Sequence, residues 1–204
     1  MAGKFIVLEG IDGAGKSTHL DFICEQIREH KQVEVLLTRE PGGTPLAEKI
    51  RALLLHEPMS VETEVLLVMA ARKDHVEQRI RPALEQGQWV VCDRFIDSTR
   101  AYQGGGGGVN LGWIDALNDM ATGGLSPDRV YLFDIPSELA AQRRGGRGSV
   151  SDRFEEQGVA YFDRVRDVYM NQRRLFAEDQ TLAIDAQQSI EAIREILRKD
   201  IQGL

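Results

Sequence analysis

The segment Gly10–Ser17, with the sequence GIDGAGKS, matches the phosphate-binding pattern GxxxxGK[ST] at every fixed position. Such a loop turns backbone N–H groups toward the phosphates of a nucleoside triphosphate, and the ammonium of Lys16 neutralises the outer phosphates. The hydroxyl of Ser17 is a suitable Mg²⁺ ligand, and that of Thr18 can donate a hydrogen bond to phosphate. A strand-like run before the motif and an amphipathic helical pattern after it disfavour a chance glycine-rich turn. The predicted site for ATP consists of Gly10, Ile11, Asp12, Gly13, Ala14, Gly15, Lys16, Ser17 and Thr18.

Two arginines that follow predicted strands could clamp a second phosphate. Arg39 lies in TREPGGT (Thr38–Thr44), whose Pro-Gly-Gly turn leaves its strand directly and is expected to aim Arg39 over the strand ends. Arg94 follows another strand, in the triplet Asp93-Arg94-Phe95. A guanidinium binds phosphate through two parallel hydrogen bonds, so the pair favours an acceptor that already carries a phosphate. Asp93 could hold Mg²⁺ through water. A surface salt bridge is the alternative role for each arginine.

A stretch rich in arginine and glycine, QRRGGRGSVSD at residues 142–152, is typical of a hinged lid. A lid that closes over the transferring group excludes water and brings positive charge to it. Arg143, Arg144 and Arg147 are the candidates to stabilise the charge that develops on a transferring phosphoryl group. The alternative is a basic loop without a catalytic role.

The elements that must position these residues are five short apolar runs, each separated from the next by enough chain for a helix. Near-continuous apolar strands of this kind indicate a parallel sheet that is buried on both faces, and ligands bind at the carboxyl ends of its strands. We therefore expect an α/β, three-layer fold of the P-loop NTPase type, as a single domain over residues 1–204 with a lid at about 142–153. The predicted strands are Lys4–Glu9, Val33–Thr38, Trp89–Cys92, Val130–Asp134 and Leu182–Asp185.

Composition excludes several classes of function. The 204 residues carry a net charge of −7, which argues against unspecific nucleic-acid binding. The longest apolar run, Val65–Ala71, is far shorter than the roughly 18 residues of a membrane span. Cys24 and Cys92 form neither a disulfide framework nor a metal motif, and no signal-peptide pattern is present, so we expect a cytoplasmic protein. The histidines lack ligand-like spacing and are expected in solvated or capping positions: His19, His30, His56 and His75.

Taken together, four motifs resemble the bacterial thymidylate kinase family over essentially the whole chain. They are EGIDGAGKST, TREPGGT, DRFIDSTRAYQGGG at Asp93–Gly106, and the Arg-Gly stretch that ends in Asp152-Arg153-Phe154-Glu155. The resemblance implies transfer of the γ-phosphate of ATP to dTMP, giving dTDP for dTTP biosynthesis, with Mg²⁺ and as a homodimer. Such catalysis relies on positioning and charge neutralisation, without a covalent protein intermediate.

The resemblance also assigns roles around the acceptor. Arg39 and Arg94 are similar to the clamp on the dTMP phosphate, and Asp12 to the carboxylate that reaches the sugar hydroxyl and orients the clamp. Tyr102 resembles the ring beneath the deoxyribose that disfavours a 2′-hydroxyl. Because Asp12 replaces an arginine of the eukaryotic branch, the catalytic arginines are expected in the lid: Arg143, Arg144 and Arg147.

Recognition of the base falls to the helical segment around Val61–Leu84, where Arg72 is a cation on an apolar stripe. The resemblance assigns Arg72 to a thymine carbonyl, and Thr99 and Gln103 to polar contacts near base and sugar. The family usually stacks an aromatic ring where this chain has Val68, so we expect weaker dTMP binding or a ring supplied from elsewhere, such as Phe95. Gly107 stands where bacterial members commonly have arginine.

Two other functions stay open at this point. The first is a kinase for another nucleotide or for a deoxynucleoside. The TREPGGT turn with Arg39 argues against the deoxynucleoside, because it favours an acceptor that already carries a phosphate. The second is an ATP-binding regulatory module, which would need no second anion site.

Overall fold

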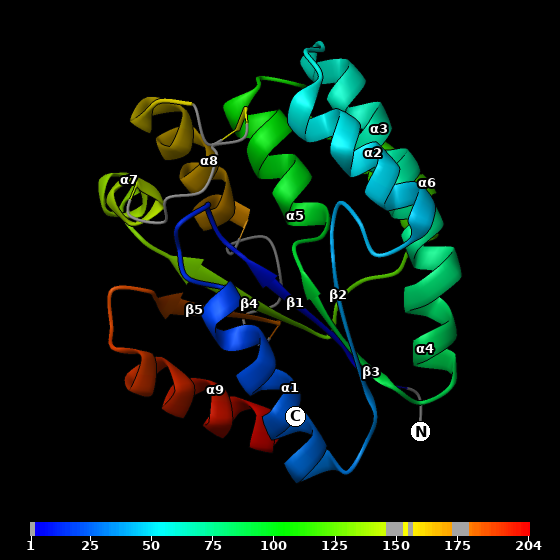
Figure 1. Cartoon of the computed structure of the whole chain (residues 1–204), viewed down its shortest axis with the longest axis vertical. Helices are drawn as coiled ribbons and strands as arrows, with labels where there is room; N and C mark the ends of the chain where they lie inside the picture. Colours follow the sequence, from blue (N-terminus) through cyan, green and yellow to red (C-terminus); the bar gives the residue numbers. More distant parts are fainter. Residues whose placement is uncertain (1–2, 146–152, 155–156, 173–179) are drawn as a thin grey trace.

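One parallel sheet of five strands forms the centre of the computed structural model, which describes residues 3–145, 153–154, 157–172 and 180–204 (Figure 1). The strand order is β2-β3-β1-β4-β5, and every neighbouring pair is parallel. This confirms the predicted α/β fold with its five strands. Their bounds are β1 (Phe5–Glu9), β2 (Val35–Arg39), β3 (Trp89–Asp93), β4 (Arg129–Asp134) and β5 (Thr181–Asp185).

The helices connect the strands and cover both faces of the sheet (Figure 1). Four of them, α2, α3, α6 and α9, begin after a residue whose side chain accepts a hydrogen bond from a backbone N–H of the first turn: Thr44, Ser60, Asn110 and Ser189. The helical elements are α1 (Ser17–Lys31), α2 (Pro45–His56), α3 (Val61–His75), η1 (Val76–Ile80), α4 (Arg81–Glu85), α5 (Ile96–Thr99), η2 (Arg100–Gly106), α6 (Leu111–Thr122), α7 (Ser137–Gly145), α8 (Val159–Gln172) and α9 (Ile190–Gly203).

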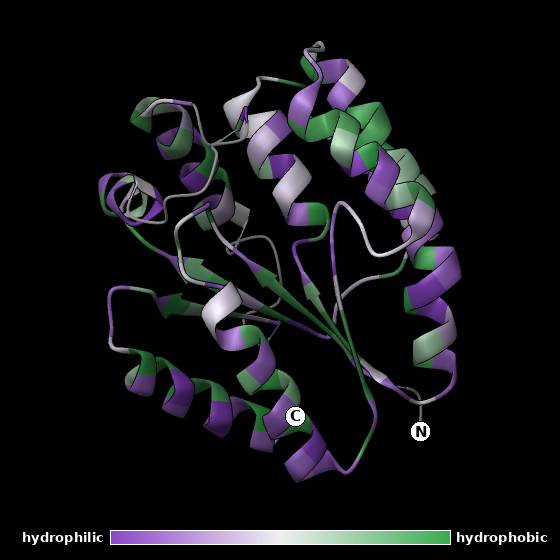
Figure 2. Ribbon diagram, viewed as in Figure 1, coloured by the Kyte–Doolittle hydropathy of each residue, from purple (hydrophilic) through white to green (hydrophobic). Residues whose placement is uncertain are grey.

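Alternation along β1 divides the core into two layers, because successive side chains of a strand point to opposite faces. Ile6 and Leu8 pack with apolar residues of α1 and α9 on one face. Phe5 and Val7 pack with residues of η1 and α4 on the other. Figure 2 shows the strands as the predominantly hydrophobic centre of the molecule. The central strand β1 therefore lies between two helical layers, and the loop that follows it opens at the carboxyl edge of the sheet.

Two π-helical segments, η1 and η2, continue α-helices of this chain. η1 joins α3 to α4, so the predicted helix around Val61–Leu84 is one continuous helical stretch with a wider turn inside it. η2 continues α5 through the glycine-rich segment and packs against α8. Short π-helical segments are frequent at functional sites.

Two of the four histidines contradict the expectation of solvated or capping positions. His19 and His75 are buried, the first with its ring stacked on Phe133 and the second among polar side chains. In the described part of the chain, no helix is both long enough and apolar enough to cross a membrane.

Candidate active site

The phosphate-binding loop connects β1 to α1 and folds around its own lysine. Nζ of Lys16 donates a hydrogen bond to the carbonyl oxygen of Gly10 at 2.8 Å, and its side chain is almost fully buried. Gly13 has a φ of +90°, and a Cβ added there would lie 2.4 Å from the carbonyl oxygen of Ala140 in α7. A side chain at this position would therefore push the loop away from α7. Ser17 and Thr18 are exposed at the first turn of α1, where a bound phosphate would lie.

The charge of Lys16 is held in a site that disfavours it. Burial and the positive charge of Arg94 lower the pKa of Lys16 to about 8, although the carboxylates of Asp93, Asp12 and Glu9 act in the opposite direction. The ammonium has thus lost most of its hydration, and the nearby carboxylates do not fully offset that loss and the repulsion from Arg94. An anionic phosphate beside it would supply what it lacks.

Arg94 is the centre of a network that connects the end of β3 to the phosphate-binding loop. Its backbone has a φ of 72°, which is rare for a residue with a side chain. Nη2 donates to Oδ1 of Asp12 at 2.7 Å and to the hydroxyl of Tyr102 at 3.0 Å. Nη1 donates to the hydroxyls of Ser98 and Tyr169 at 3.1 and 3.2 Å. Four partners from four parts of the chain leave the guanidinium little freedom to rotate.

Asp12 is ionised in this network. Burial acts to raise the pKa of its carboxyl group, but the charges of Arg94 and Lys16 and the hydrogen bond from Tyr102 outweigh burial and hold the pKa well below its usual range. The Tyr102 hydroxyl donates to Oδ2 of Asp12 at 2.7 Å. The loop that is expected to bind ATP therefore carries a fixed negative charge on the side that faces Arg94.

Glu9 supports the turn that carries Arg94, a role the sequence did not reveal. Its buried carboxylate accepts hydrogen bonds from the backbone N–H of Phe95 at 2.8 Å, the hydroxyl of Ser98 at 2.6 Å and the hydroxyl of Tyr169 at 2.9 Å. The signal in the sequence was a carboxylate at the end of an otherwise apolar strand, which has to find partners when it is buried.

A cavity of about 660 Å³, its open mouth included, lies beside the phosphate-binding loop. Most residues predicted for the acceptor line it: Asp12, Val68, Arg72, Arg94, Phe95, Thr99, Tyr102 and Gln103. The sequence did not single out the other lining residues: Glu40, Pro41, Arg51, Leu54, Leu55, Ser98 and Phe154.

Arg39 lies away from this cavity, contrary to the expectation from the sequence. Its guanidinium pairs with Glu48 of α2 at 2.9 Å, and 54% of its side chain is exposed. Adjacent residues at a strand end point to opposite sides, so the next residue, Glu40, is the one that enters the cavity wall.

Arg51 of α2 lines the cavity where Arg39 was expected. Its Nη1 donates to the carbonyl oxygen of Pro41 at 2.9 Å. A signal for it was present: Arg51 shares a helical face with the buried Ala47 and Leu54, the same pattern that singled out Arg72.

Arg72 is buried in α3 and is bound on several sides. Its Nε donates to Oε2 of Glu40 at 2.7 Å and Nη2 donates to the carbonyl oxygen of Phe95 at 2.9 Å, while Nη1 donates to Oδ1 of Asn118. The buried cation has protein partners, and its expected contact with a thymine carbonyl stays a prediction. The guanidinium also lies over the ring of Phe95, 5.2 Å from its centroid.

The two lid arginines within the described residues lie against the phosphate-binding loop. Nη1 of Arg143 is 3.9 Å from the point where a Cβ on Gly15 would be. Nη1 of Arg144 donates to the carbonyl oxygen of Asp12 at 2.6 Å, and its guanidinium lies 3.9 Å from the centroid of the Phe162 ring. Arg147 lies outside the described residues, as do the lid positions 146–152.

The residues expected to hold Mg²⁺ fit that role in their chemistry. Oδ1 of Asp93 is buried at the end of β3 and has no hydrogen-bond partner in the described ranges, so it is available to a ligand or its water. Within these ranges no cluster of three or more histidine, cysteine, aspartate or glutamate side chains could form a metal site of its own. A Mg²⁺ ion that takes most of its ligands from nucleotide phosphates and water would need only one or two protein ligands, such as Asp93 and Ser17.

Comparisons with known proteins show which family the chain belongs to. The family model described as thymidylate kinase matches residues 8–196. The thymidylate kinase of Cupriavidus necator is 48% identical over 202 residues, which is 98% of each chain. That of Pseudomonas syringae pv. tomato is 50% identical over 98% of this chain and 95% of its own. A crystal structure of thymidylate kinase from Ehrlichia chaffeensis matches with a TM-score of 0.80 at 33% identity, over 99% of both chains. The chain belongs to the thymidylate kinase family, and its reaction is the ATP-dependent phosphorylation of dTMP to dTDP.

Proposed function

We propose that dTMP binds in the cavity with its phosphate between Arg51 and Arg94 and its base toward Arg72. The observation that carries this proposal is the 2.7 Å ion pair between Arg94, which lines the cavity, and Asp12, which belongs to the phosphate-binding loop. Through this pair the two nucleotide sites share one wall. A γ-phosphate in the loop and an acceptor phosphate on Arg94 would then lie within reach of each other.

At the phosphate end, Arg94 and Arg51 form the clamp. Arg94 approaches from the end of β3 and Arg51 from α2, so the two guanidinium groups come from different elements that line one cavity. Two guanidinium charges suit a dianionic acceptor phosphate. Asp12 keeps Arg94 oriented through its carboxylate and can accept a hydrogen bond from the sugar hydroxyl.

The sugar is expected to pack on Tyr102. The hydroxyl of this residue is already engaged with Asp12 and Arg94, so its ring is fixed as a wall of the cavity. A rigid ring close to the sugar disfavours an additional 2′-hydroxyl by steric contact and by leaving that hydroxyl without a partner. This supports a deoxyribose acceptor.

At the base end, Arg72 donates to a carbonyl oxygen of thymine. Its fixed contacts leave one N–H of Nη2 without a hydrogen bond to any described residue, and Arg72 lines the cavity. Thr99 and Gln103 line the same wall and supply further polar atoms.

The aromatic surface that Val68 does not provide is supplied by other rings. Phe95 lines the cavity, but its ring packs edge-on against Phe5 at 5.0 Å and lies under Arg72. Phe154 also lines the cavity, at 6.3 Å from the ring of Tyr102. We assign the apolar contact with the base to Val68 and Phe154 together.

Phosphoryl transfer relies on fixed charge around the transferring group. Lys16 neutralises phosphate oxygens in the loop, and Arg143, which lies over Gly15, adds a second cation. Arg144 anchors α7 to the carbonyl of Asp12, and Arg147 is a further candidate. Ser17 and Asp93 would hold Mg²⁺, directly and through water. The ion would neutralise charge on the β- and γ-phosphates of ATP.

We also propose that the chain acts as one domain, in the cytoplasm and as a homodimer. One sheet carries both nucleotide sites, which supports a single functional unit. Cys24 and Cys92 are buried free thiols, as expected in a reducing compartment. Exposed apolar side chains on the adjacent helices α3 and α6 support an isologous contact between two copies.

A matched pair of variants tests the placement of the acceptor phosphate. Arg51→Ala should raise the KM for dTMP about tenfold, because it removes a charged hydrogen-bond donor to phosphate. Arg39→Ala should keep the KM for dTMP within about twofold of the wild-type value, because Arg39 is exposed and pairs with Glu48 outside the cavity lining. The binding of thymidine, which has no phosphate, should change in neither variant. An effect of Arg39→Ala larger than that of Arg51→Ala would show that the phosphate lies elsewhere.

A further inference from the structure

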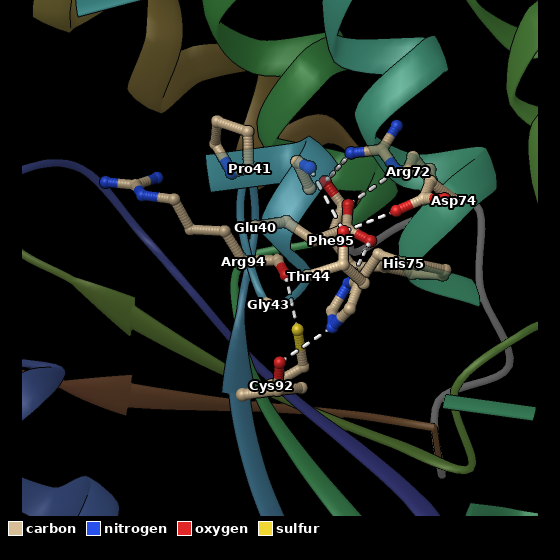
Figure 3. A network of polar contacts seen from close by, with 12 residues as sticks. Glu40, Pro41, Gly43, Thr44, Arg72, Asp74, His75, Cys92, Arg94 and Phe95 are labelled. Carbon is tan, nitrogen blue, oxygen red and sulfur yellow. Dashed lines mark hydrogen bonds and ion pairs between the residues drawn. The ribbon is translucent and has the colours of Figure 1, made fainter. Parts of the chain in front are cut away.

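A buried chain of hydrogen bonds runs from β2 through His75 to Arg72 (Figure 3). Nε2 of His75 lies 2.7 Å from Oγ1 of Thr38, and Nδ1 lies 3.0 Å from Oε1 of Glu40. The other oxygen of Glu40 accepts from Nε of Arg72 at 2.7 Å. The exposed fractions of His75, Glu40 and Arg72 are 0%, 3% and 2%. Two of these residues, Glu40 and Arg72, also line the acceptor cavity, whereas His75 lies behind them.

The partners assign the protons of this chain. The carboxylate of Glu40 can only accept, so Nδ1 of His75 carries the hydrogen. Nε2 is in hydrogen-bond contact with the hydroxyl of Thr38, and the two contacts together fix the rotation of the ring.

Glu40 is the side chain through which His75 acts on the cavity. Each oxygen of its carboxylate has one strong donor, His75 on one side and Arg72 on the other. Loss of the histidine donor would leave a buried carboxylate oxygen unsatisfied, and the group would gain by turning toward another donor. Because Arg72 donates from Nε to this carboxylate, a rotation of Glu40 tilts the plane of the guanidinium that faces the base.

The surroundings of His75 are built by the same turn that carries Glu40. A Cβ added to Gly43 would lie 2.4 Å from Nε2 of His75, so this glycine permits the close approach of the ring. Thr44, which caps α2, donates from its hydroxyl to Asp74, the neighbour of His75 in α3 (Figure 3). Four residues of the TREPGGT segment thus contact positions 72–75 of α3: Thr38, Glu40, Gly43 and Thr44.

We propose that His75 is a positioning residue for recognition of the acceptor base, which acts through Glu40 on Arg72. The inference rests on the proposed contact between Arg72 and the base. His75 itself touches neither nucleotide. Its function is to hold Glu40 in the one orientation that presents the free N–H of Arg72 to the cavity.

Two isosteric variants separate positioning from packing. The amide nitrogen of asparagine stands one bond beyond Cγ, as Nδ1 of histidine does, so His75→Asn can keep the hydrogen bond to Glu40. The amide of glutamine replaces Nε2 instead, so His75→Gln keeps only the contact with Thr38. Both variants leave similar gaps and are expected to lose similar thermal stability.

The expected result is a difference in KM for dTMP. His75→Gln should raise this KM about tenfold and His75→Asn less than about threefold, as expected for one hydrogen bond to a charged group. The kcat and the KM for ATP should stay within about twofold in both variants. dUMP should respond as dTMP does, because uracil has both carbonyl oxygens of thymine.

Variants of Thr38 test the positioning role of His75 independently, because Thr38 contacts the other nitrogen of its ring. Thr38→Val removes the hydroxyl that holds Nε2 of His75 but keeps the shape of the side chain, and Thr38→Ser keeps the hydroxyl. The valine variant should raise the KM for dTMP in the same direction as His75→Gln, and the serine variant should restore it.

The proposal is overturned if His75→Asn and His75→Gln raise the KM for dTMP equally, or if the KM for ATP rises in parallel. An Arg72→Lys variant distinguishes this failure from failure of the proposed base contact. If Arg72→Lys leaves the KM for dTMP unchanged, the base contact and the role of His75 are both wrong. If Arg72→Lys raises it but His75→Gln does not, the role of His75 alone is wrong.

Discussion

Among single residues, Lys16 shows how the fold prepares a side chain to bind an anion. The ammonium is buried and close to Arg94, and both effects lower its pKa to about 8. In the folded state without nucleotide, the charge is present below this pH and is lost as pH rises through it. Bound phosphate favours the charged form and raises the pKa again.

The first prediction follows from this shift. The affinity for ATP should fall about tenfold between pH 7.5 and pH 9, because each molecule with a neutral Lys16 must take up a proton to bind. Binding is measured without acceptor by titration calorimetry in buffers of different ionisation enthalpy, which also counts the protons taken up. Lys16→Arg is the control, since arginine stays charged over this range. The same slope in both proteins would contradict the assignment.

Arg39 and Arg51 illustrate a second lesson about single residues. Both are arginines near one turn, and the motif pointed to the first, but the cavity contains the second. The direction of a side chain at a strand end depends on the last peptide of the strand. The cation on the buried face of α2 was the more reliable signal, because helical periodicity defines a face over several turns.

Among the elements, the contact between η2 and α8 depends on glycine. A Cβ added to Gly105 would lie 2.5 Å from Cγ2 of Val168 and 2.8 Å from the carbonyl oxygen of Arg164. The run of glycines at 104–106 therefore lets two backbones approach, in the segment that also carries Tyr102 and Gln103. The packing of α8 is thereby connected to the wall of the acceptor cavity.

We expect Gly105→Ala to lower the free energy of unfolding by about 1–3 kcal/mol, because the added methyl overpacks this contact. Urea denaturation measures the change. Val168→Ala in the same background should recover part of the loss, since it removes the nearer of the two clashing atoms. Gly203→Ala in α9 is the matched control, because a Cβ there meets no atom within 4 Å. Equal stability of Gly105→Ala and Gly203→Ala would argue against the close contact.

At the level of the protein surface, α3 and α6 pack side by side and expose large apolar side chains. Leu66 of α3 is 60% exposed, and Trp113 and Met120 of α6 are each 67% exposed. A group of this kind is more typical of a contact with another protein than of a free surface. The two helices also carry Arg72 and Asn118, so a dimer contact here would stabilise the base end of the cavity.

A charge placed on this surface tests the homodimer. Trp113→Glu should convert the protein to a monomer at micromolar concentration, as measured by light scattering after size exclusion, because a carboxylate is costly to bury at an interface. Ile190→Glu at the start of α9, where the native side chain is 44% exposed, should leave the oligomeric state unchanged. A wild-type monomer, or dissociation of both variants, would contradict the assigned interface.

The sequence was sufficient for the order of the elements and for the place of the Gly10–Ser17 loop between β1 and α1. The phosphate-binding loop is a contiguous motif, and the strands and the Arg72 face of α3 follow from periodicity over a few residues. Features of this kind depend on residues close together in the sequence, so local patterns predict them. They do not depend on how distant segments meet.

Only the tertiary structure decided which side chains meet around the acceptor. The residues that sequence reasoning missed come from four separate parts of the chain: Glu9 from β1, Glu40 from the end of β2, Arg51 from α2 and His75 from α3. His75 is 35 residues from its partner Glu40, and Glu9 is 86 residues from its partner Phe95. Buried polar groups choose partners by three-dimensional proximity, because each must replace the water it has lost. A histidine without ligand spacing thus lies within hydrogen-bond distance of the buried partner of Arg72, which no local pattern could have shown.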